Sequence, residues 1–401
     1  MKKSLFVLGL LLVFININAS AAQISAGSWK FVLKTPNADV PFIINFKYQN
    51  KKLTGVLHNG KEKIPLKDIA YNKDSISIPL QTYELSLELT QQTPKLVSGN
   101  LVRHNKNPVI KTPIHGQYGF KKRYDAPKGK ALINLTGIWS LIMEDEKGEK
   151  GPAIGKFTQK NHHFSGSILT PTGDYRYIDG QVSGDKFEGA SFDGVYNYVL
   201  RGSVKKGEMT AEVLSSSKTK VSGKIEPNVQ LPDAYKQTEI EELKFIFPNL
   251  KGQSVSLNHA KFLGKPVIVQ IFGSWCPNCL DEMNYLIPWY LENSKRGVEI
   301  IALAFERSLS PEEATRQLIK VQKKMKVPYV ILQAGSTSED KPAEKLLGLK
   351  NFISFPTTIF LDKKHKVIKV HAGFSGPSTG EYFEKWKTEF NQTVDELLAN
   401  D

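Results

Sequence analysis

The chain contains two cysteines in 401 residues, and they lie three positions apart in the run Trp275-Cys276-Pro277-Asn278-Cys279. A structural disulfide in an exported protein normally joins distant parts of the chain. A disulfide that closes so short a loop removes little conformational entropy from the unfolded state and therefore stabilises little. The pair is better explained by thiol reactivity.

The position of the two cysteines assigns them different tasks. An apolar strand is expected at 267–272, and a helix is expected to begin at Pro277 and run to about residue 295. A cysteine at a helix N-terminus faces unpaired backbone N–H groups and the positive end of the helix dipole, which favour the thiolate. Cys276 is therefore the predicted nucleophile. Cys279, one turn later, is predicted to resolve the mixed disulfide that Cys276 forms.

Other uses of a Cys-x-x-Cys pair fit less well. A zinc site needs two further ligands, for which His259 and His371 are the candidates, and a c-type haem site needs a histidine where Leu280 stands. A passive local disulfide is the remaining alternative. We expect no metal and no cofactor.

The composition excludes three classes of protein. With 40% hydrophobic residues and two cysteines, the chain is neither a disordered polyelectrolyte nor a multi-disulfide miniprotein, and it lacks the repeated long apolar runs of a multipass membrane protein. The formal charge of +14 favours acidic or anionic surfaces. Because the basic residues are scattered, we interpret them as solvated surface and expect no nucleic-acid partner.

The start of the chain reads as a signal peptide at 1–21. Met1-Lys2-Lys3 is basic, 5–15 is an apolar run too short to span a bilayer comfortably, and Ala19-Ser20-Ala21 has the form of a cleavage site. The expected location is the periplasm. The alternative, an uncleaved anchor, would make the protein membrane-associated.

Residues 24–226 predict an all-β region, because short alternating stretches such as 83–89 are separated by turn pairs such as Asn59-Gly60. The region also repeats at a spacing near 110 residues. Gly27-Ser28-Trp29 returns as Gly137-Ile138-Trp139, and Leu53-Thr54-Gly55 returns as Phe164-Ser165-Gly166. We therefore expect two antiparallel barrel or sandwich units, at 24–122 and 132–226, with both tryptophans in their cores. They are candidates to bind an envelope partner.

A polar segment at 227–244, with Pro227 and Pro232, is the expected linker. Beyond it, in 245–401, strands and helices alternate. Strands are expected at 267–272, 298–305, 329–331, 357–361 and 367–370, and helices at 277–295, 311–325 and 379–398. This order predicts a mixed α/β sheet with both faces covered.

Three motifs in this region carry a resemblance to a known family. They are the run from Val267 through Trp275-Cys276-Pro277-Asn278-Cys279, Phe247-Pro248-Asn249-Leu250-Lys251-Gly252, and Phe355-Pro356-Thr357-Thr358-Ile359-Phe360-Leu361-Asp362. Together they resemble the exported thioredoxin-like proteins of the TlpA/ResA/cytochrome-c-maturation family over about 245–401. The resemblance implies a thioredoxin-like domain that exchanges disulfides with protein substrates and is recharged by a membrane-linked or soluble thiol donor.

The family also implies a docking surface. Pro356 aligns with the family's cis-proline beside the dithiol, where the backbone of Phe355 would be free to pair with an extended substrate segment. Trp275 and Pro277 are expected to shape the same surface. An ordinary trans-proline at a strand start is the alternative for Pro356.

Glu282 matches an acidic residue of the family. Its position three residues after Cys279 puts it on the same helix face, where it could relay the proton of the resolving thiol. A solvated helix glutamate is the alternative. General thioredoxins bury an acid where Gln270 stands here, so Glu282, or else Glu306, must carry any acid–base role.

The predicted function is an exported thiol–disulfide oxidoreductase that reduces protein disulfides. A thiol peroxidase is the first alternative, although Gly273 stands in place of the threonine that its peroxide-binding motif requires. The second alternative is a binding module whose dithiol senses redox state.

Overall fold

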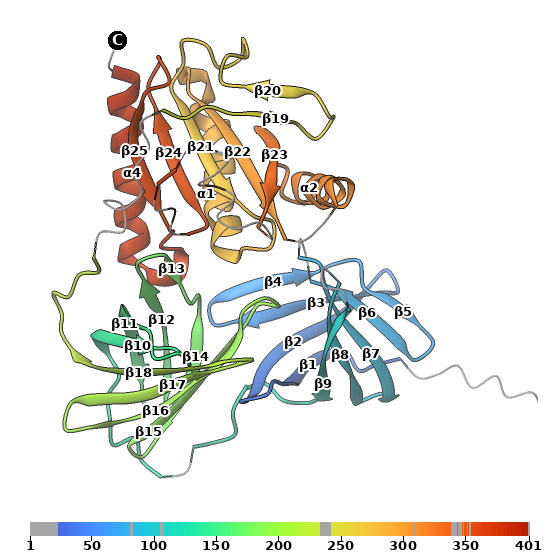
Figure 1. Ribbon diagram of the computed structural model, residues 1–401. Coiled ribbons are helices and arrows are strands. Elements are labelled where there is room, and N and C mark those ends of the chain that lie inside the picture. Colours follow the sequence, from blue (N-terminus) through green and yellow to red (C-terminus); the bar gives the residue numbers. More distant parts are fainter. Residues whose placement is uncertain are drawn as a thin grey trace, which may run out of the picture.

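The computed structural model describes residues 23–80, 83–104, 108–127, 129–232, 242–307, 310–337, 343, 347, 349–350, 352 and 354–399 (Figure 1). The expected signal peptide at 1–21 lies outside the described residues, as does the part of the expected linker at 233–241. Within the described ranges, no helix is both long enough and apolar enough to cross a membrane.

The first β unit is a nine-stranded antiparallel sheet with the order β4-β3-β2-β1-β9-β8-β7-β6-β5. The described residues show no pairing between the outer strands β4 and β5, so the sheet is an open, curved layer. Its strands are β1 (Gly27–Lys34), β2 (Asp39–Gln49), β3 (Lys52–Asn59), β4 (Glu62–Leu66), β5 (Ala70–Asn72), β6 (Ser75–Pro79), β7 (Leu85–Thr93), β8 (Leu96–Arg103) and β9 (Ile110–Tyr118).

The second β unit closes on itself. Its order is β11-β10-β18-β17-β16-β15-β14-β12-β13, and an additional pairing of β11 with β12 joins the two ends into an antiparallel barrel with the short β13 at its rim. Closure removes the exposed sheet edges. The strands are β10 (Gly137–Glu144), β11 (Lys150–Lys160), β12 (His163–Thr170), β13 (Gly173–Asp174), β14 (Ile178–Ser183), β15 (Lys186–Phe192), β16 (Asn197–Lys205), β17 (Glu208–Leu214) and β18 (Lys218–Ile225).

The sequence repeat has a structural counterpart. Trp29 and Trp139 have no solvent-exposed surface, which confirms their predicted place in the two cores. Each indole N–H donates to the carbonyl four residues earlier, that of Ser25 at 2.8 Å and that of Leu135 at 2.9 Å. The strand register repeats as well: Gly27 pairs with Phe46, and Gly137 pairs with Phe157.

The C-terminal domain is the predicted mixed α/β sheet, with the order β23-β22-β21-β24-β25. The strands β23, β22 and β21 are parallel, β24 runs antiparallel to β21, and β25 runs antiparallel to β24. The elements are β19 (Ile246–Pro248), β20 (Ser254–Ser256), β21 (Val267–Phe272), α1 (Pro277–Asn293), β22 (Glu299–Glu306), α2 (Pro311–Met325), β23 (Val330–Ser336), β24 (Thr357–Leu361), β25 (Val367–Ala372) and α4 (Glu381–Ala399).

Both faces of this sheet are covered, as predicted. On one face Ile268 packs with helix residues such as Met283 of α1 and Phe390 of α4. On the other face Val269 packs with Phe262, which lies in the segment before β21. Every residue of β21 is therefore buried, which explains its uninterrupted apolar run.

The two β units share a packed contact. Phe42 of β2 stacks on Phe192 of β15, with ring centroids 3.7 Å apart and planes 7° from parallel. Arg123, in the segment between the units, donates to the carbonyl oxygens of Ala190 at 2.5 Å and His58 at 2.6 Å. The two sheets are thus joined by stacking and by a buried guanidinium.

One arginine joins all three parts of the chain. The guanidinium of Arg176, just after β13, lies 2.5 Å from Glu62 of the first unit, 3.1 Å from Asp193 of the barrel and 3.3 Å from Asp281 of α1. We call these four residues the Arg176 cluster. Burial raises the pKa of each carboxyl, that of Asp281 to about 7, against the opposing effect of the arginine. A single buried cation therefore faces three carboxyl groups.

We expect Arg176→Met to lower the apparent free energy of unfolding by about 3 kcal/mol at pH 8, because it leaves buried carboxylates without their cation. The loss should shrink at pH 5, because Asp281, whose pKa is raised to about 7, is protonated there and no longer needs the cation. Urea denaturation followed by tryptophan fluorescence measures both values.

The matched control is Arg201→Met, which breaks a single exposed ion pair with Glu188. Its cost should stay below about 1 kcal/mol at both pH values. Equal losses in the two variants would show that the Arg176 cluster does not hold the units together.

Candidate active site

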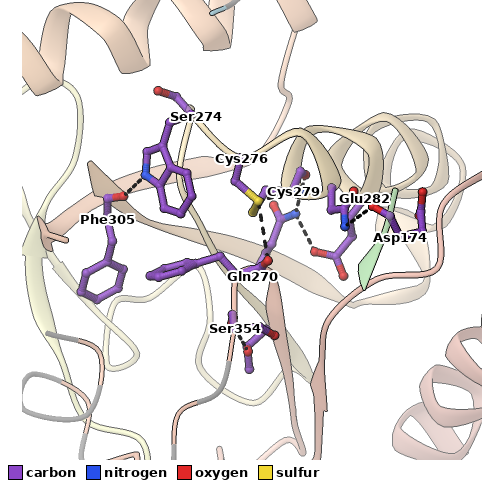
Figure 2. The surroundings of a disulfide bond; sticks show 12 residues. Asp174, Gln270, Ser274, Cys276, Cys279, Glu282, Phe305 and Ser354 are labelled. Carbon is purple, nitrogen blue, oxygen red and sulfur yellow. Dashed lines mark hydrogen bonds between the residues drawn. A yellow bond between two sulfur atoms is a disulfide. The ribbon is translucent and has the colours of Figure 1, made fainter. Parts of the chain in front are cut away.

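The two cysteines form a disulfide at the start of α1, with Cα atoms 5.3 Å apart (Figure 2). Cys276 is the N-cap residue, and its Sγ accepts a hydrogen bond from the backbone N–H of Cys279 at 3.3 Å. The sulfur of Cys276 thus accepts a backbone amide at the helix start, an arrangement that favours a thiolate in the reduced state. Cys276 is 5% exposed and Cys279 is completely buried. Of the two cysteines, only Cys276 has any exposed surface.

The loop before the dithiol is anchored to the end of β22. The indole N–H of Trp275 donates to the carbonyl of Phe305 at 2.9 Å, and the guanidinium of Arg307 lies 3.8 Å from the centre of the indole ring. Glu306 accepts from the backbone N–H of Ser274 at 2.9 Å and from its hydroxyl at 2.7 Å. Glu306 thus fixes the loop, although its pKa is raised by burial.

The peptide bond between Phe355 and Pro356 is cis, as predicted. The carbonyl oxygen of Phe355 lies 3.6 Å from the Sγ of Cys276. The phenyl ring of Phe355 packs edge-on against the indole of Trp275, with ring centroids 5.4 Å apart. The carbonyl of Pro356 accepts from the backbone N–H of Gly373 at 2.8 Å. The cis-proline segment therefore lies directly beside the sulfur of Cys276. Pro277 occupies the first turn of α1.

Glu282 is completely buried beneath the dithiol, so the alternative of a solvated helix glutamate is wrong. Its carboxyl accepts from the hydroxyl of Thr358 at 2.6 Å and from the amide of Gln270 at 2.7 Å. Burial raises the pKa of Glu282 to about 7, and the two hydrogen bonds only partly oppose this. The group can both hold and release a proton near neutral pH.

Gln270 connects this acid to Cys279. Its amide nitrogen donates both to Glu282 and, at 3.3 Å, to the backbone carbonyl of Cys279 (Figure 2). Its amide oxygen has no hydrogen-bond partner among the described residues. Rotation of the amide would present that oxygen to the proton of a neutral Glu282. General thioredoxins carry a buried acid at the strand position of Gln270. Here the buried acid is Glu282 of α1, whose carboxyl contacts Gln270.

The barrel contributes residues that the sequence did not identify as part of this region. The side-chain amide of Asn278, between the two cysteines, donates to the carbonyl of Asp174 at 3.4 Å. The carboxyl of Asp174 accepts from the backbone N–H of Gly376 at 2.7 Å and from the hydroxyl of Ser378 at 2.9 Å. The residues Thr172-Gly173-Asp174 have the pattern of an ordinary turn, and nothing in that pattern indicates a partner 104 residues away.

The histidines considered as zinc ligands have other surroundings. His371 is buried and accepts from the indole N–H of Trp386 at 2.9 Å, and burial lowers its pKa to about 3. Nδ1 of His259 accepts from the backbone N–H of Lys261 at 3.2 Å. In the part of the chain that the structure describes, no three His, Cys, Asp or Glu side chains gather as a metal site.

Comparisons with known proteins agree with this geometry. A family model described as Redoxin matches residues 225–384. A thiol-disulfide oxidoreductase ResA from Bacillus thuringiensis subsp. konkukian is 30% identical over 146 residues, which cover 36% of this chain and 74% of that protein. The sporulation thiol-disulfide oxidoreductase A of Bacillus subtilis is 23% identical over 145 residues, which cover 36% of this chain and 78% of that protein.

Among solved structures, a thiol:disulfide interchange protein from Chlorobium tepidum TLS matches with 19% identity and a TM-score of 0.30, over 40% of this chain and 96% of that one. The ResA relative supplies the assignment, because the match extends over about three quarters of its length at 30% identity. Through its C-terminal domain, the chain belongs to the ResA-like family of thioredoxin-type thiol–disulfide oxidoreductases.

Proposed function

We propose that this oxidoreductase is exported to the periplasm and reduces the disulfides of other proteins. The observation that carries the proposal is the placement of both cysteines at the start of α1 beside the cis-proline, with Cys276 the less buried of the two. The basic and apolar residues of 1–21 support export, and the family resemblance supports action as a reductant.

The proposed reaction is two successive thiol–disulfide exchanges. The thiolate of Cys276 attacks one sulfur of a client disulfide, and the other client sulfur leaves as a thiolate that takes up a proton. The thiolate of Cys279 then attacks the Sγ of Cys276 and releases the second client sulfur. The client gains two electrons and two protons, and the Cys276–Cys279 disulfide remains. A thiol donor restores the dithiol.

Glu282 is proposed to take the proton of the Cys279 thiol in the second exchange. Its raised pKa lies between those of an ordinary carboxyl and an ordinary thiol, which suits a base that must accept and then return a proton. The hydrogen bonds of Gln270 hold the carboxyl next to the backbone of Cys279. Deep burial restricts this proton to a local relay.

The client is proposed to dock across Trp275, Pro277, Phe355 and Pro356. An extended client segment that pairs with the backbone of Phe355 would bring its sulfur to Cys276, since the Phe355 carbonyl lies beside that Sγ. The edge-on rings of Trp275 and Phe355 form an apolar side to this surface.

A trapping experiment tests the two cysteine roles. Cys279→Ser should accumulate a mixed disulfide between Cys276 and a model client, because the resolving attack is lost. Cys276→Ser should form almost none. Non-reducing electrophoresis and mass spectrometry measure the adducts, and equal trapping by both variants would contradict the assignment.

Glu282→Gln should slow release of a preformed mixed disulfide at least about tenfold at pH 7. The variant should also change the pH dependence of stability. Because the folded pKa is raised from 4.5 to about 7, the unfolded chain loses this proton first. The wild-type contribution to stability is therefore present below pH 4.5 and falls as the pH rises to 7, by about 2 to 3 kcal/mol between pH 5 and pH 8.

In Glu282→Gln this fall should be absent, so the wild type and the variant should diverge between pH 5 and pH 8 in urea denaturation. Glu292→Gln, an exposed position on the same helix, is the matched control and should follow the wild type. A release rate unchanged in Glu282→Gln would contradict the relay, whatever the stability shows.

Location and direction can be tested in one experiment. The protein should be found in a periplasmic extract. Alkylation of free thiols in that extract should label both Cys276 and Cys279, since a thiol donor must keep the dithiol of a reductase reduced. The equilibrium potential of the pair should lie nearer the value of about −270 mV for thioredoxin than the value of about −120 mV for a strong oxidant. Recovery with the cytoplasm would contradict export, and an oxidised pair would contradict the direction.

A further inference from the structure

The barrel reaches the active site through one turn, residues 170–174, which we call the barrel turn. Gly173 of this turn closes on Asn278, so that a Cβ atom at position 173 would collide with the Asn278 amide nitrogen. Asn278 is only 5% exposed although it lies between the two cysteines. The barrel therefore covers the middle of the Cys-x-x-Cys motif.

The same turn also packs beside the cis-proline segment. A Cβ atom added to Gly373 would come within 2.8 Å of the backbone of Thr172, and Gly373 itself donates to the carbonyl of Pro356. The barrel turn thus contacts both structures between which a client segment must lie: the start of α1 and the loop behind Pro356.

Several polar contacts fix this arrangement. The carboxyl of Asp174, 3% exposed as a residue, bonds to Gly376 and Ser378, and the hydroxyl of Ser378 also lies 3.1 Å from that of Ser167 on β12. Figure 2 shows Asp174 close to the helix that carries Cys279 and Glu282. Behind the turn, Arg176 reaches Asp281 on the same helix. The contact is a packed and hydrogen-bonded interface between the barrel and the thioredoxin-like domain.

We propose that the barrel turn is a specificity-determining wall of the active site, which admits a disulfide carried on an extended, flexible segment and excludes one displayed on a folded surface. The argument rests on the proposed reductase function. Because the residue Cys276 is only 5% exposed and the barrel turn covers Asn278, a client sulfur must approach Cys276 from the side on which Phe355 lies. A single strand can do so, whereas a broad folded surface would meet the barrel first.

The test uses the reduced full-length protein and two substrates: an unstructured peptide with one disulfide, and a folded protein with a surface disulfide of matched potential. Rates of dithiol oxidation are followed by tryptophan fluorescence. The wild type should react at least about tenfold faster with the peptide, because the folded substrate must first displace the barrel. Equal rates would overturn the proposal.

Loosening the wall should reduce this discrimination. In Asp174→Ala/Ser378→Ala, the ratio of the peptide rate to the folded-substrate rate should fall about fivefold. Ser378→Ala alone should lower this ratio less. The matched control is Asp145→Ala, which removes a turn-forming aspartate that bonds to the backbone of Lys147 and Glu149 in the same barrel. It should leave the ratio unchanged. If all three variants change both rates by the same factor, the turn has only a structural role.

A measurement on the wild type keeps the test independent of variant folding. The reduced protein is alkylated with N-ethylmaleimide and with a maleimide that carries a polyethylene glycol chain, and the rate ratio is compared with that of an unstructured cysteine peptide. The bulky reagent should react more slowly than N-ethylmaleimide by a much larger factor in the protein than in the peptide. An equal factor in both would contradict the proposed wall. Failure to turn over either disulfide substrate would instead contradict the reductase function.

Discussion

The hydrogen bond from the backbone N–H of Cys279, in the first turn of α1, to the sulfur of Cys276 is the interaction on which the rest of the site depends. A sulfur at an N-cap position accepts the Cys279 amide and lies at the positive end of a helix of four to five turns. The loop before it is fixed by Glu306 and by the indole of Trp275, and the cis-proline segment approaches it from the other side. The surrounding structure keeps this one atom at the end of the helix dipole.

The buried acid of this site lies on the helix α1, because the strand position that is acidic in general thioredoxins holds Gln270 here. The strand offers Gln270, which cannot titrate, and the helix places Glu282 against it. An amide at this position can donate to a carboxylate and, after rotation, accept from a carboxylic acid, so it can serve both protonation states. Thr358 supplies a second donor from the strand that follows the cis-proline. The substitution of Gln for an acid therefore relocates the titrating group.

Local patterns were sufficient to predict the chemistry and much of the fold. The dithiol, the helix start and most α/β elements could be predicted because each depends on neighbouring residues: the helix at 311–325, for example, begins with a capping box between Ser310 and Glu313 and ends where predicted. The cis-proline was predicted from the family resemblance. The buried tryptophans followed from a repeat. Closure of the second sheet and not the first could not be foreseen, since it depends on the pairing of β11 with β12. The roles of Asp174 and Arg176 were also hidden, because most of their partners lie more than a hundred residues away in the sequence and each stands in what reads as an ordinary surface turn.

The closed barrel has a mechanical consequence for access to the dithiol. The β12–β13 turn is hydrogen-bonded into a continuous cylinder, so it cannot fold back as a free loop does. In the proposal above, widening the approach to Cys276 would require the barrel to move away from α1, and Arg176 would then separate from Asp281 on that helix. Entry of a large client would therefore break part of the Arg176 cluster, so that client size and the stability of this interface would be linked.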